Sequence, residues 1–241
     1  MIQILKTSAA IGGALLFSAA GGTAASAAII QNFDSGWYTN SGFTAGVNNI
    51  NVGSSNLNGA VYRNWLAFNI SGLAPNQKIT SATLTFYGGN GVNTSSTSET
   101  LGLFDYTGSI ASLIANSQNN VGIFTDLGDG SSYGSAVVAP GAIQQFSIPL
   151  NQAAISNLNI AAQNKSDSRF VIGGSLQSIS GPFANEQLFA IFGPRVALTP
   201  AAALEIDIAT VPEPASWAMM IAGFGMAGTA VRRRQTKVRF A

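Results

Sequence analysis

Apolar and polar residues alternate along two stretches in the first half of the chain, with the period of two that a half-buried strand requires. Over residues 61–70 one face collects Tyr62, Leu66, Phe68 and Ile70, with Asn64 among them. Over residues 80–87 one face collects Ala82, Leu84 and Phe86, and the other collects Thr83, Thr85 and Tyr87. Both patterns predict strands of an antiparallel sheet with one buried face.

Further short segments read in the same way along the body. Residues 29–60 contain Asn- and Gly-rich turns between short strands, and residues 88–98 and 126–130 form polar loops. Strands are expected over 101–106, 133–138, 142–148, 169–172, 187–192 and 204–208. Ser109 is placed to cap a short helix that runs through Asn116. Asn151 is placed to cap a helix over 152–163, whose apolar stripe contains Ala154, Ile155, Leu158 and Ala162. Many short strands separated by turns favour a mainly β domain over residues 28–210, an antiparallel β-sandwich or jelly roll with one or two short helices.

The first 27 residues have the pattern of a secretory signal peptide. Lys6 precedes an apolar stretch over residues 9–20, and small residues follow up to Ala25-Ser26-Ala27. We therefore expect an N-terminal signal helix, export through the Sec machinery, and cleavage that leaves Ala28 as the first mature residue.

The last 31 residues, 211–241, have three parts in order. Pro212-Glu213-Pro214 comes first, an uncharged apolar segment over 217–231 follows, and Arg232, Arg233 and Arg234 come next, with Lys237 and Arg239 within the basic segment 232–239. A helix of 15 residues spans about 22 Å at about 1.5 Å per residue, which is shorter than the roughly 20 residues that usually cross a bilayer.

Even so, this segment is expected to be a transmembrane helix. The helix should start just after Pro214, with Trp217 at the interface and the arginines in the cytoplasm, which puts the body outside. A buried helix of a soluble core is disfavoured because cations directly follow the apolar segment.

This order of motif, Trp217-Ala218, glycine-rich helix and three arginines resembles the PEP-CTERM sorting signal, whose tail is also labelled the ice-binding protein C-terminal domain. The resemblance covers about 25 residues. It implies recognition by an exosortase, a membrane-embedded processing enzyme that would cut near 212–214, and an association with exopolysaccharide and biofilm. It does not imply ice binding, for which Thr80, Thr83 and Thr85 give no regular flat array.

A second resemblance concerns the body. The run 62–70, the turn at Pro75 and the run 79–84 are similar to carbohydrate-binding-like β-sandwiches of the DNRLRE type, which carry an arginine-led strand that ends in Phe-Asp-x-Ser. Here Asn69 stands where the aspartate is usual, and the helix over 152–163 is unusual for that group.

Composition excludes several function classes. Lys6 leaves with the signal peptide and five further cations leave with the tail, so five of the eleven Lys and Arg remain. Nine of the ten acidic residues remain if the cut precedes Glu213, so the mature body carries a net charge near −4. That charge does not suit nucleic-acid binding. The chain has no cysteine and no histidine, which excludes disulfides, Ser-His-Asp triads and ordinary zinc sites, and no cofactor is expected.

Carboxylates and aromatic residues are the remaining candidates for chemistry. Asp126 and Asp129 lie three apart in a glycine-rich loop and could bind calcium, although solvated turn residues are the simpler interpretation. Glu205 and Asp207 share one face of the last strand, which indicates an outward polar face more than a catalytic pair. Trp37, Tyr38 and Trp65 are candidate glycan contacts. Trp65 lies on the face opposite Leu66 and Phe68, which leaves it free to be exposed, although large aromatic residues in small β proteins are more often core.

These observations predict an exported, non-enzymatic protein of the cell envelope or extracellular matrix. Before processing it is held in the inner membrane, and exosortase then delivers it to the outer surface or the matrix, where it could bind polysaccharide. The alternative is a polysaccharide-active hydrolase or lyase that uses carboxylates. A row of exposed aromatic side chains without a cleft would favour the first hypothesis. Two acids that face each other about 5–10 Å apart across a groove would favour the second.

Overall fold

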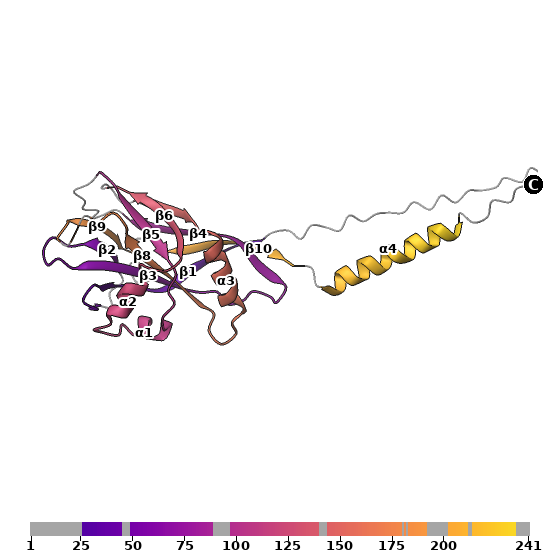
Figure 1. Ribbon diagram of the computed structural model, residues 1–241, viewed down its shortest axis with the longest axis horizontal. Coiled ribbons are helices and arrows are strands. Elements are labelled where there is room, and N and C mark those ends of the chain that lie inside the picture. Colours follow the sequence, from indigo (N-terminus) through magenta and orange to yellow (C-terminus); the bar gives the residue numbers. More distant parts are fainter. Residues whose placement is uncertain are drawn as a thin grey trace, which may run out of the picture.

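The computed structural model describes residues 26–44, 49–88, 97–139, 144–179, 181, 183–191, 202–211 and 214–234. The expected signal helix and Ala25 lie outside these residues. Within them, ten strands and four helices follow the order shown in Figure 1. The strands are β1 (Ser26–Thr39), β2 (Asn49–Ser54), β3 (Val61–Asn69), β4 (Gln77–Gly88), β5 (Glu99–Phe104), β6 (Ser132–Val138), β7 (Gln144–Pro149), β8 (Arg169–Leu176), β9 (Glu186–Ile191) and β10 (Ala203–Thr210). The helices are α1 (Ile110–Ile114), α2 (Val121–Asp126), α3 (Gln152–Gln163) and α4 (Pro214–Arg234).

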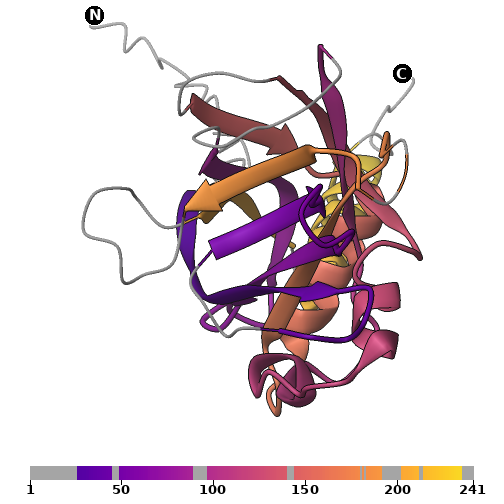
Figure 2. The ribbon, with the colours of Figure 1, turned by 90° about the vertical axis from the view of Figure 1, so that its left-hand side faces the viewer.

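Every pairing of the described strands is antiparallel, and the strand order is β6-β5-β8-β3-β1-β10-β4-β7. β2 pairs with both β3 and β9, and Figure 2 shows β2 and β9 side by side. β1 belongs to two sheets, because Ser26–Gln31 pairs with β10 and Asn32–Thr39 pairs with β3. The expected mainly β, antiparallel domain is confirmed. Its strands form a nearly barrel-like arrangement, so the more specific expectation of a sandwich or jelly roll is not confirmed.

One large hydrophobic core lies between the two sheets. β4, β7 and β10 contribute side chains such as Leu84, Ile148 and Leu204, and β3 and β8 contribute Leu66 and Ile172 from the other side. The inward face predicted for residues 61–70 is confirmed, since Leu66, Phe68 and Ile70 are all core residues. The inward face predicted over 80–87 is likewise confirmed by the buried set Ala82, Leu84 and Phe86, although Thr85 on the opposite face is buried as well.

A second, smaller core covers the outer face of β3. Trp65 and Ala67 pack there against Leu113 of α1 and Ile123 of α2, together with Tyr38, Leu127 and Val171. Figures 1 and 2 show the two short helices lying against this side of the sheet. The prediction of a loop over 126–130 is only partly confirmed, because Asp126 is the last residue of α2.

The helix predicted over 152–163 is confirmed as α3. The side chain of Asn151 accepts hydrogen bonds from the main-chain N–H groups of Ala153 and Ala154, which are otherwise unpaired at a helix N-terminus. Ser109 caps α1 in the same way through Ser112 N–H. In the middle of α3, the side-chain amide of Asn159 accepts from the N–H of Ile79 at 2.9 Å and donates to its carbonyl oxygen at 2.9 Å. These bonds fix α3 to the edge of β4.

Candidate functional site

The three aromatic residues predicted as glycan contacts are buried. Tyr38 and Trp65 are 0% exposed and Trp37 is 7% exposed. Trp65 lies beside its cross-strand partner Gly36, where an added Cβ would come within 3.0 Å of the indole ring. The expectation that Trp65 could be exposed is wrong because α1 and α2 cover its face. None of the three rings is placed to stack on a sugar from solvent.

Asp126 has a structural role. Its Oδ2 accepts from the N–H groups of Thr107 and Gly108 at 3.0 and 2.7 Å, and its Oδ1 accepts from the Thr107 hydroxyl at 3.0 Å. Asp129 is exposed and lies near Arg63, where its charge opposes the lowering of the Arg63 pKa by burial. No group of three or more His, Cys, Asp or Glu able to hold a metal ion occurs among the described residues.

Arg63 connects β3 to α2. One of its guanidinium nitrogens donates to the carbonyl oxygens of Phe124 and Thr125 at 3.0 and 2.8 Å, and the guanidinium carbon lies 4.5 Å from the centre of the Phe124 ring. The last carbonyls of a helix have no partner within the helix, so these bonds stabilise the C-terminal end of α2.

Glu205 and Asp207 lie on the outer face of β10, and both are exposed, as expected. Asp207 Oδ2 accepts from the Ser81 hydroxyl on the neighbouring β4 at 2.5 Å. This places the two acids on a solvated sheet face rather than in a cleft.

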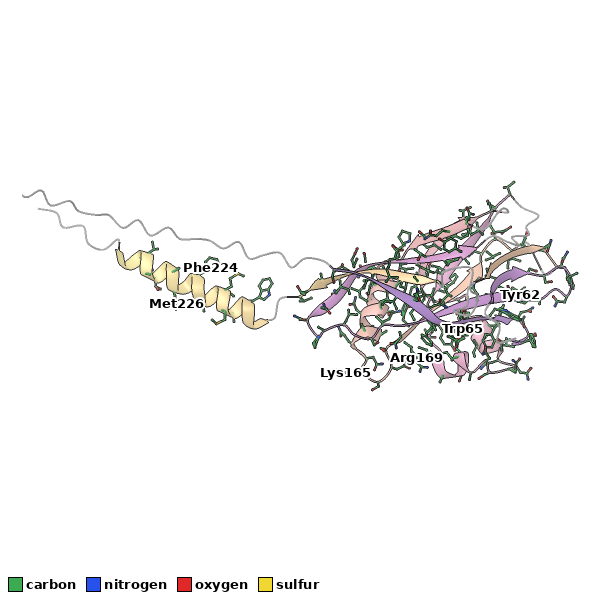
Figure 3. All side chains as sticks on the ribbon, turned by 180° about the vertical axis from the view of Figure 1, so that it is seen from behind. Tyr62, Trp65, Lys165, Arg169, Phe224 and Met226 are labelled. Carbon is green, nitrogen blue, oxygen red and sulfur yellow. The ribbon has the colours of Figure 1, made fainter. Side chains whose placement is uncertain are left out.

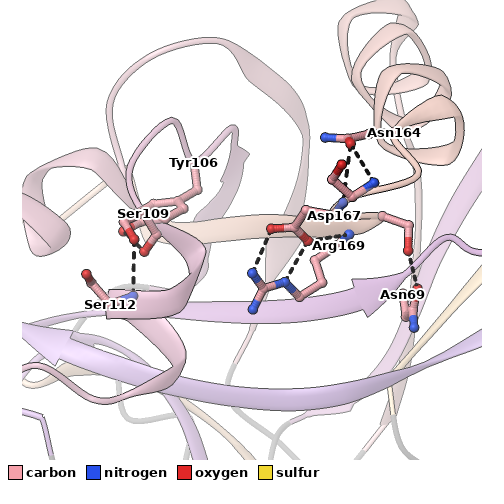
Figure 4. Close-up of polar contacts among 9 residues, drawn as sticks. Asn69, Tyr106, Ser109, Ser112, Asn164, Asp167 and Arg169 are labelled. Carbon is pink, nitrogen blue, oxygen red and sulfur yellow. Dashed lines mark hydrogen bonds and ion pairs between the residues drawn. The ribbon is translucent and has the colours of Figure 1, made fainter.

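Sequence reasoning missed a groove between α3 and the start of β8. It has a volume of about 240 Å³ and contains Tyr106, Ile160, Asn164, Asp167 and Arg169 in its lining. In Figure 4, Tyr106 stands on one side and the Asp167–Arg169 pair on the other. The sequence signal for it was slight, since an Asp-x-Arg spacing is short and common.

The polar end of this groove is held in a fixed geometry. Arg169 binds Asp167 through two parallel hydrogen bonds, Nε to Oδ1 at 2.7 Å and Nη2 to Oδ2 at 2.6 Å. Asn164 Oδ1 accepts from the N–H groups of Ser166 and Asp167, and the Ser168 hydroxyl donates to Asn69 at 2.7 Å. Its hydrogen bonds to Arg169 lower the pKa of Asp167, and the same bonds raise the pKa of Arg169, so the pair is ionised at neutral pH.

A second, larger cavity of about 470 Å³ lies between the β3–β4 turn and the end of α3. Its lining includes Leu73, Pro75, Gln77, Gln163 and Lys165. This cavity adjoins the place where the chain leaves the body. Thr210 at the end of β10 pairs with Gln77, and Val211 N–H donates to the carbonyl oxygen of Asn76 at 2.7 Å.

The start of the body lies next to its end, because the first residues of β1 pair with the last part of β10. At the start of β1, Ser26 pairs with Ile208, and Ala27 and Ala28 pair with Asp207 and Ile206. The expected cleavage between Ala27 and Ala28 would remove two paired residues and leave the rest of β1 in register. That cleavage stays a prediction.

The C-terminal helix α4 begins at Pro214 itself rather than just after it, and proline is suited to this first helical position. Figures 1 and 3 show it apart from the body, and Figure 3 shows Phe224 and Met226 on its surface. Every residue from Trp217 to Arg232 is exposed, with Trp217 at 59% and Ile221 at 71%. Pro212 and Glu213 lie outside the described residues, and so do the side chains of Arg233 and Arg234.

None of the helices in the described part of the chain combines the length and apolar character needed to cross a membrane. The transmembrane character expected for 217–231 is therefore not confirmed, although the helix itself is.

The helix, the proline at its start and the arginines at its end all fall within one stretch that a comparison with protein families recognises. Residues 210–234 match the PEP-CTERM protein-sorting motif. The match implies an exported protein that an exosortase sorts to the surface of the cell envelope. A comparison with curated proteins found no match to the chain.

The PEP-CTERM motif thus begins at the last residue of β10. Its first residue, Thr210, is still paired with Gln77 of the body. The carbohydrate-binding-like resemblance of residues 62–84 lies outside the matched segment and is unconfirmed.

Proposed function

We propose that the body is a non-catalytic protein of the cell envelope or extracellular matrix, which exosortase processing of its tail releases or transfers. The observation that carries this proposal is the PEP-CTERM match at 210–234, on a tail whose side chains from Trp217 to Arg232 do not pack against the body. A tail that contributes nothing to the core can be removed without unfolding the domain.

Before processing, the proposal places α4 at the inner membrane. Its exposed apolar residues include Met219, Ile221 and Phe224, and Arg232 follows them. Exposed apolar surface of this kind is stabilised by lipid, and arginine is attracted to anionic headgroups.

Substitution within the motif tests the proposal. A triple variant with Pro212→Ala, Glu213→Ala and Pro214→Ala should accumulate unprocessed in the membrane fraction of the host. Thr229→Ala, a change on the exposed surface of the same helix, is the matched control and should be processed like wild type. Normal processing of the triple variant would refute the proposed use of the motif.

We propose that the body has no catalytic activity. This is supported by the engagement of carboxylates in structural contacts: Asp126 holds a loop, Asp167 is paired with Arg169, and Asp207 is bonded to Ser81. Incubation of the protein with the host's own exopolysaccharide should produce no new reducing ends or unsaturated sugars. Their appearance would favour the hydrolase or lyase alternative.

The proposed destination is the exopolysaccharide of a biofilm. The processed protein should co-purify with the polysaccharide fraction of the matrix, and cells that lack the protein should form an altered biofilm. Recovery of the processed protein only in the culture medium, free of polysaccharide, would contradict this part of the proposal.

A further inference from the structure

The groove between α3 and β8 combines an apolar floor with a polar end. Ile110, Phe170 and Val171 contribute apolar atoms to its lining, and Ile160 is 67% exposed on α3. Tyr106 contributes a half-buried ring whose hydroxyl donates to Ser109 O at 3.2 Å. Such a mixture of apolar surface and a few fixed polar groups is typical of small-molecule sites.

The polar end retains unused hydrogen-bonding capacity. Arg169 has five side-chain N–H donors, and its bonds to Asp167 use two of them, which leaves three without a partner among the residues that the structure describes. Asp167 has about four acceptor positions, of which Arg169 fills three through its Nε, Nη2 and main-chain N–H. Adjacent free donors and an acceptor, already held in place, match a pair of neighbouring hydroxyl groups, each of which donates and accepts.

Charge selects against ionic ligands. The guanidinium and the carboxylate lie within 2.6 Å and compensate one another. An anion close enough to bind Arg169 would be repelled by Asp167, and a cation would be repelled by Arg169. The groove therefore suits a ligand that is neutral, hydroxylated and apolar on one face.

We propose that this groove binds one neutral sugar residue of a polysaccharide, with Tyr106 and Ile160 against the ring and the Asp167–Arg169 pair at two adjacent hydroxyls. A volume of about 240 Å³ holds a single sugar ring rather than an oligosaccharide. This inference rests on the proposed function, which brings the protein to a polysaccharide. It moves glycan binding from the buried Trp37, Tyr38 and Trp65 to an open groove beside the second core, with which it shares Val171.

Its test uses the full-length chain in a zwitterionic detergent, because a detergent with a sugar headgroup would compete. The probes are the methyl glycosides of glucose, galactose and mannose, together with glucuronate and glucosamine as anionic and cationic analogues. Saturation-transfer NMR detects weak binding, and shifts of the Arg169 side-chain N–H signals locate it. At least one neutral glycoside should bind in the groove, with both charged analogues weaker.

Variants separate the groove from the rest of the body. Tyr106→Ala, and the neutral double variant with Asp167→Asn and Arg169→Gln, should each weaken binding by about tenfold, the loss expected for a central contact. Tyr106→Phe retains the ring and should bind within about threefold of wild type, a difference well below that loss. Lys165→Ala, a neighbour in the same loop that lines the other cavity, should bind like wild type.

Three results would overturn the inference. They are no binding by any of the three neutral glycosides, glucuronate bound as tightly as they are, or unchanged binding in Tyr106→Ala and in the double variant. Thermal unfolding of each variant verifies that it is folded. Exosortase-dependent processing in the host, measured on the same variants, shows whether the sorting proposal stands independently of sugar binding.

Discussion

The main-chain N–H of Val211 donates to the carbonyl oxygen of Asn76 at 2.7 Å, so the body holds the chain immediately before the Pro-Glu-Pro motif. One residue earlier, Thr210 is paired with Gln77. A protease that binds its substrate in an extended conformation needs several residues on each side of the cut. We therefore expect the end of β10 to separate from β4 during processing.

Covalent locking of this pair tests that expectation. Directly opposed residues of an antiparallel pair have Cα atoms about 4.5 or 5.5 Å apart, which suits a disulfide. The chain has no cysteine of its own, so the double variant Gln77→Cys with Thr210→Cys should form a single disulfide after export. Processing should slow by about tenfold or more, because local opening is no longer available.

The control is a disulfide between two other paired strands of the body. Thr100 and Val137 are paired between β5 and β6 and are not buried. The double cysteine variant at these positions should be processed at the wild-type rate. Wild-type processing of the oxidised 77–210 variant would show that the end of β10 need not open. Reductant should restore the rate of that variant, which separates the effect of the disulfide from that of the two substitutions.

Asn159 should be among the most sensitive polar residues of the body. Its side chain satisfies both main-chain groups of Ile79 and also donates to Ile155 O at 2.8 Å. Asn159→Ala leaves the Ile79 N–H and C=O unpaired in a buried position, which should lower the free energy of unfolding by about 2–4 kcal/mol. Urea denaturation measures this loss. Ser156→Ala, exposed on the same helix, should change stability by less than about 0.5 kcal/mol, and equal effects would contradict the assigned role.

Buried tyrosine predicts loss of stability in alkali. Burial raises the pKa of Tyr133 to about 12, while a hydrogen bond from Asn157 at 2.7 Å opposes that shift. Because the folded-state pKa exceeds the ordinary value of about 10, the unfolded chain releases this proton first. The contribution of Tyr133 to the free energy of unfolding is complete below pH 10. It is lost as the pH rises to 12, at about 1.4 kcal/mol per pH unit.

Tyr133→Phe should therefore make stability less dependent on pH over this range. Denaturation curves recorded between pH 10 and 12 give the slope of the free energy of unfolding against pH. In the variant this slope should correspond to about one proton fewer released on unfolding. Tyr106, whose pKa burial also raises to about 12, accounts for a second proton, so Tyr106→Phe should reduce the slope too. An identical slope in wild type and in Tyr133→Phe would contradict the assignment.

Local patterns predicted the parts of the fold that local physics decides. The period-two faces of β3 and β4 and the Asn151 cap of α3 follow from neighbouring residues, and the structure confirms them. The burial of Trp65 could not be predicted in this way. It depends on Leu113 and Ile123, which lie about 50 residues further along the chain.

The groove was hidden for the same reason. Tyr106 reaches it from the segment after β5, Ile160 from α3 and Arg169 from β8, so only the folded topology brings them together. The sorting tail was readable because its motif, apolar stretch and arginines are contiguous in the sequence.

The contact between Trp65 and Gly36 gives a test of the second core. An added Cβ at Gly36 would lie 3.0 Å from the indole, a distance that requires the ring to move. Gly36→Ala should therefore destabilise the protein by about 1–3 kcal/mol, as overpacking does, and change the tryptophan fluorescence. Gly72→Ala does not serve as a control, since Gly72 has a φ of 99°. Ala67→Gly, a small change in the same core, should leave the fluorescence nearly unchanged.

Intact mass spectrometry of the protein from its own host, with and without active exosortase, shows whether the tail is removed at the Pro-Glu-Pro motif. We expect a mature chain that starts at Ala28 and ends near Pro212–Pro214 when the enzyme is active, and a chain that retains its tail in the membrane fraction when it is not. An identical C-terminal end on the protein from cells with and without active exosortase would contradict exosortase processing.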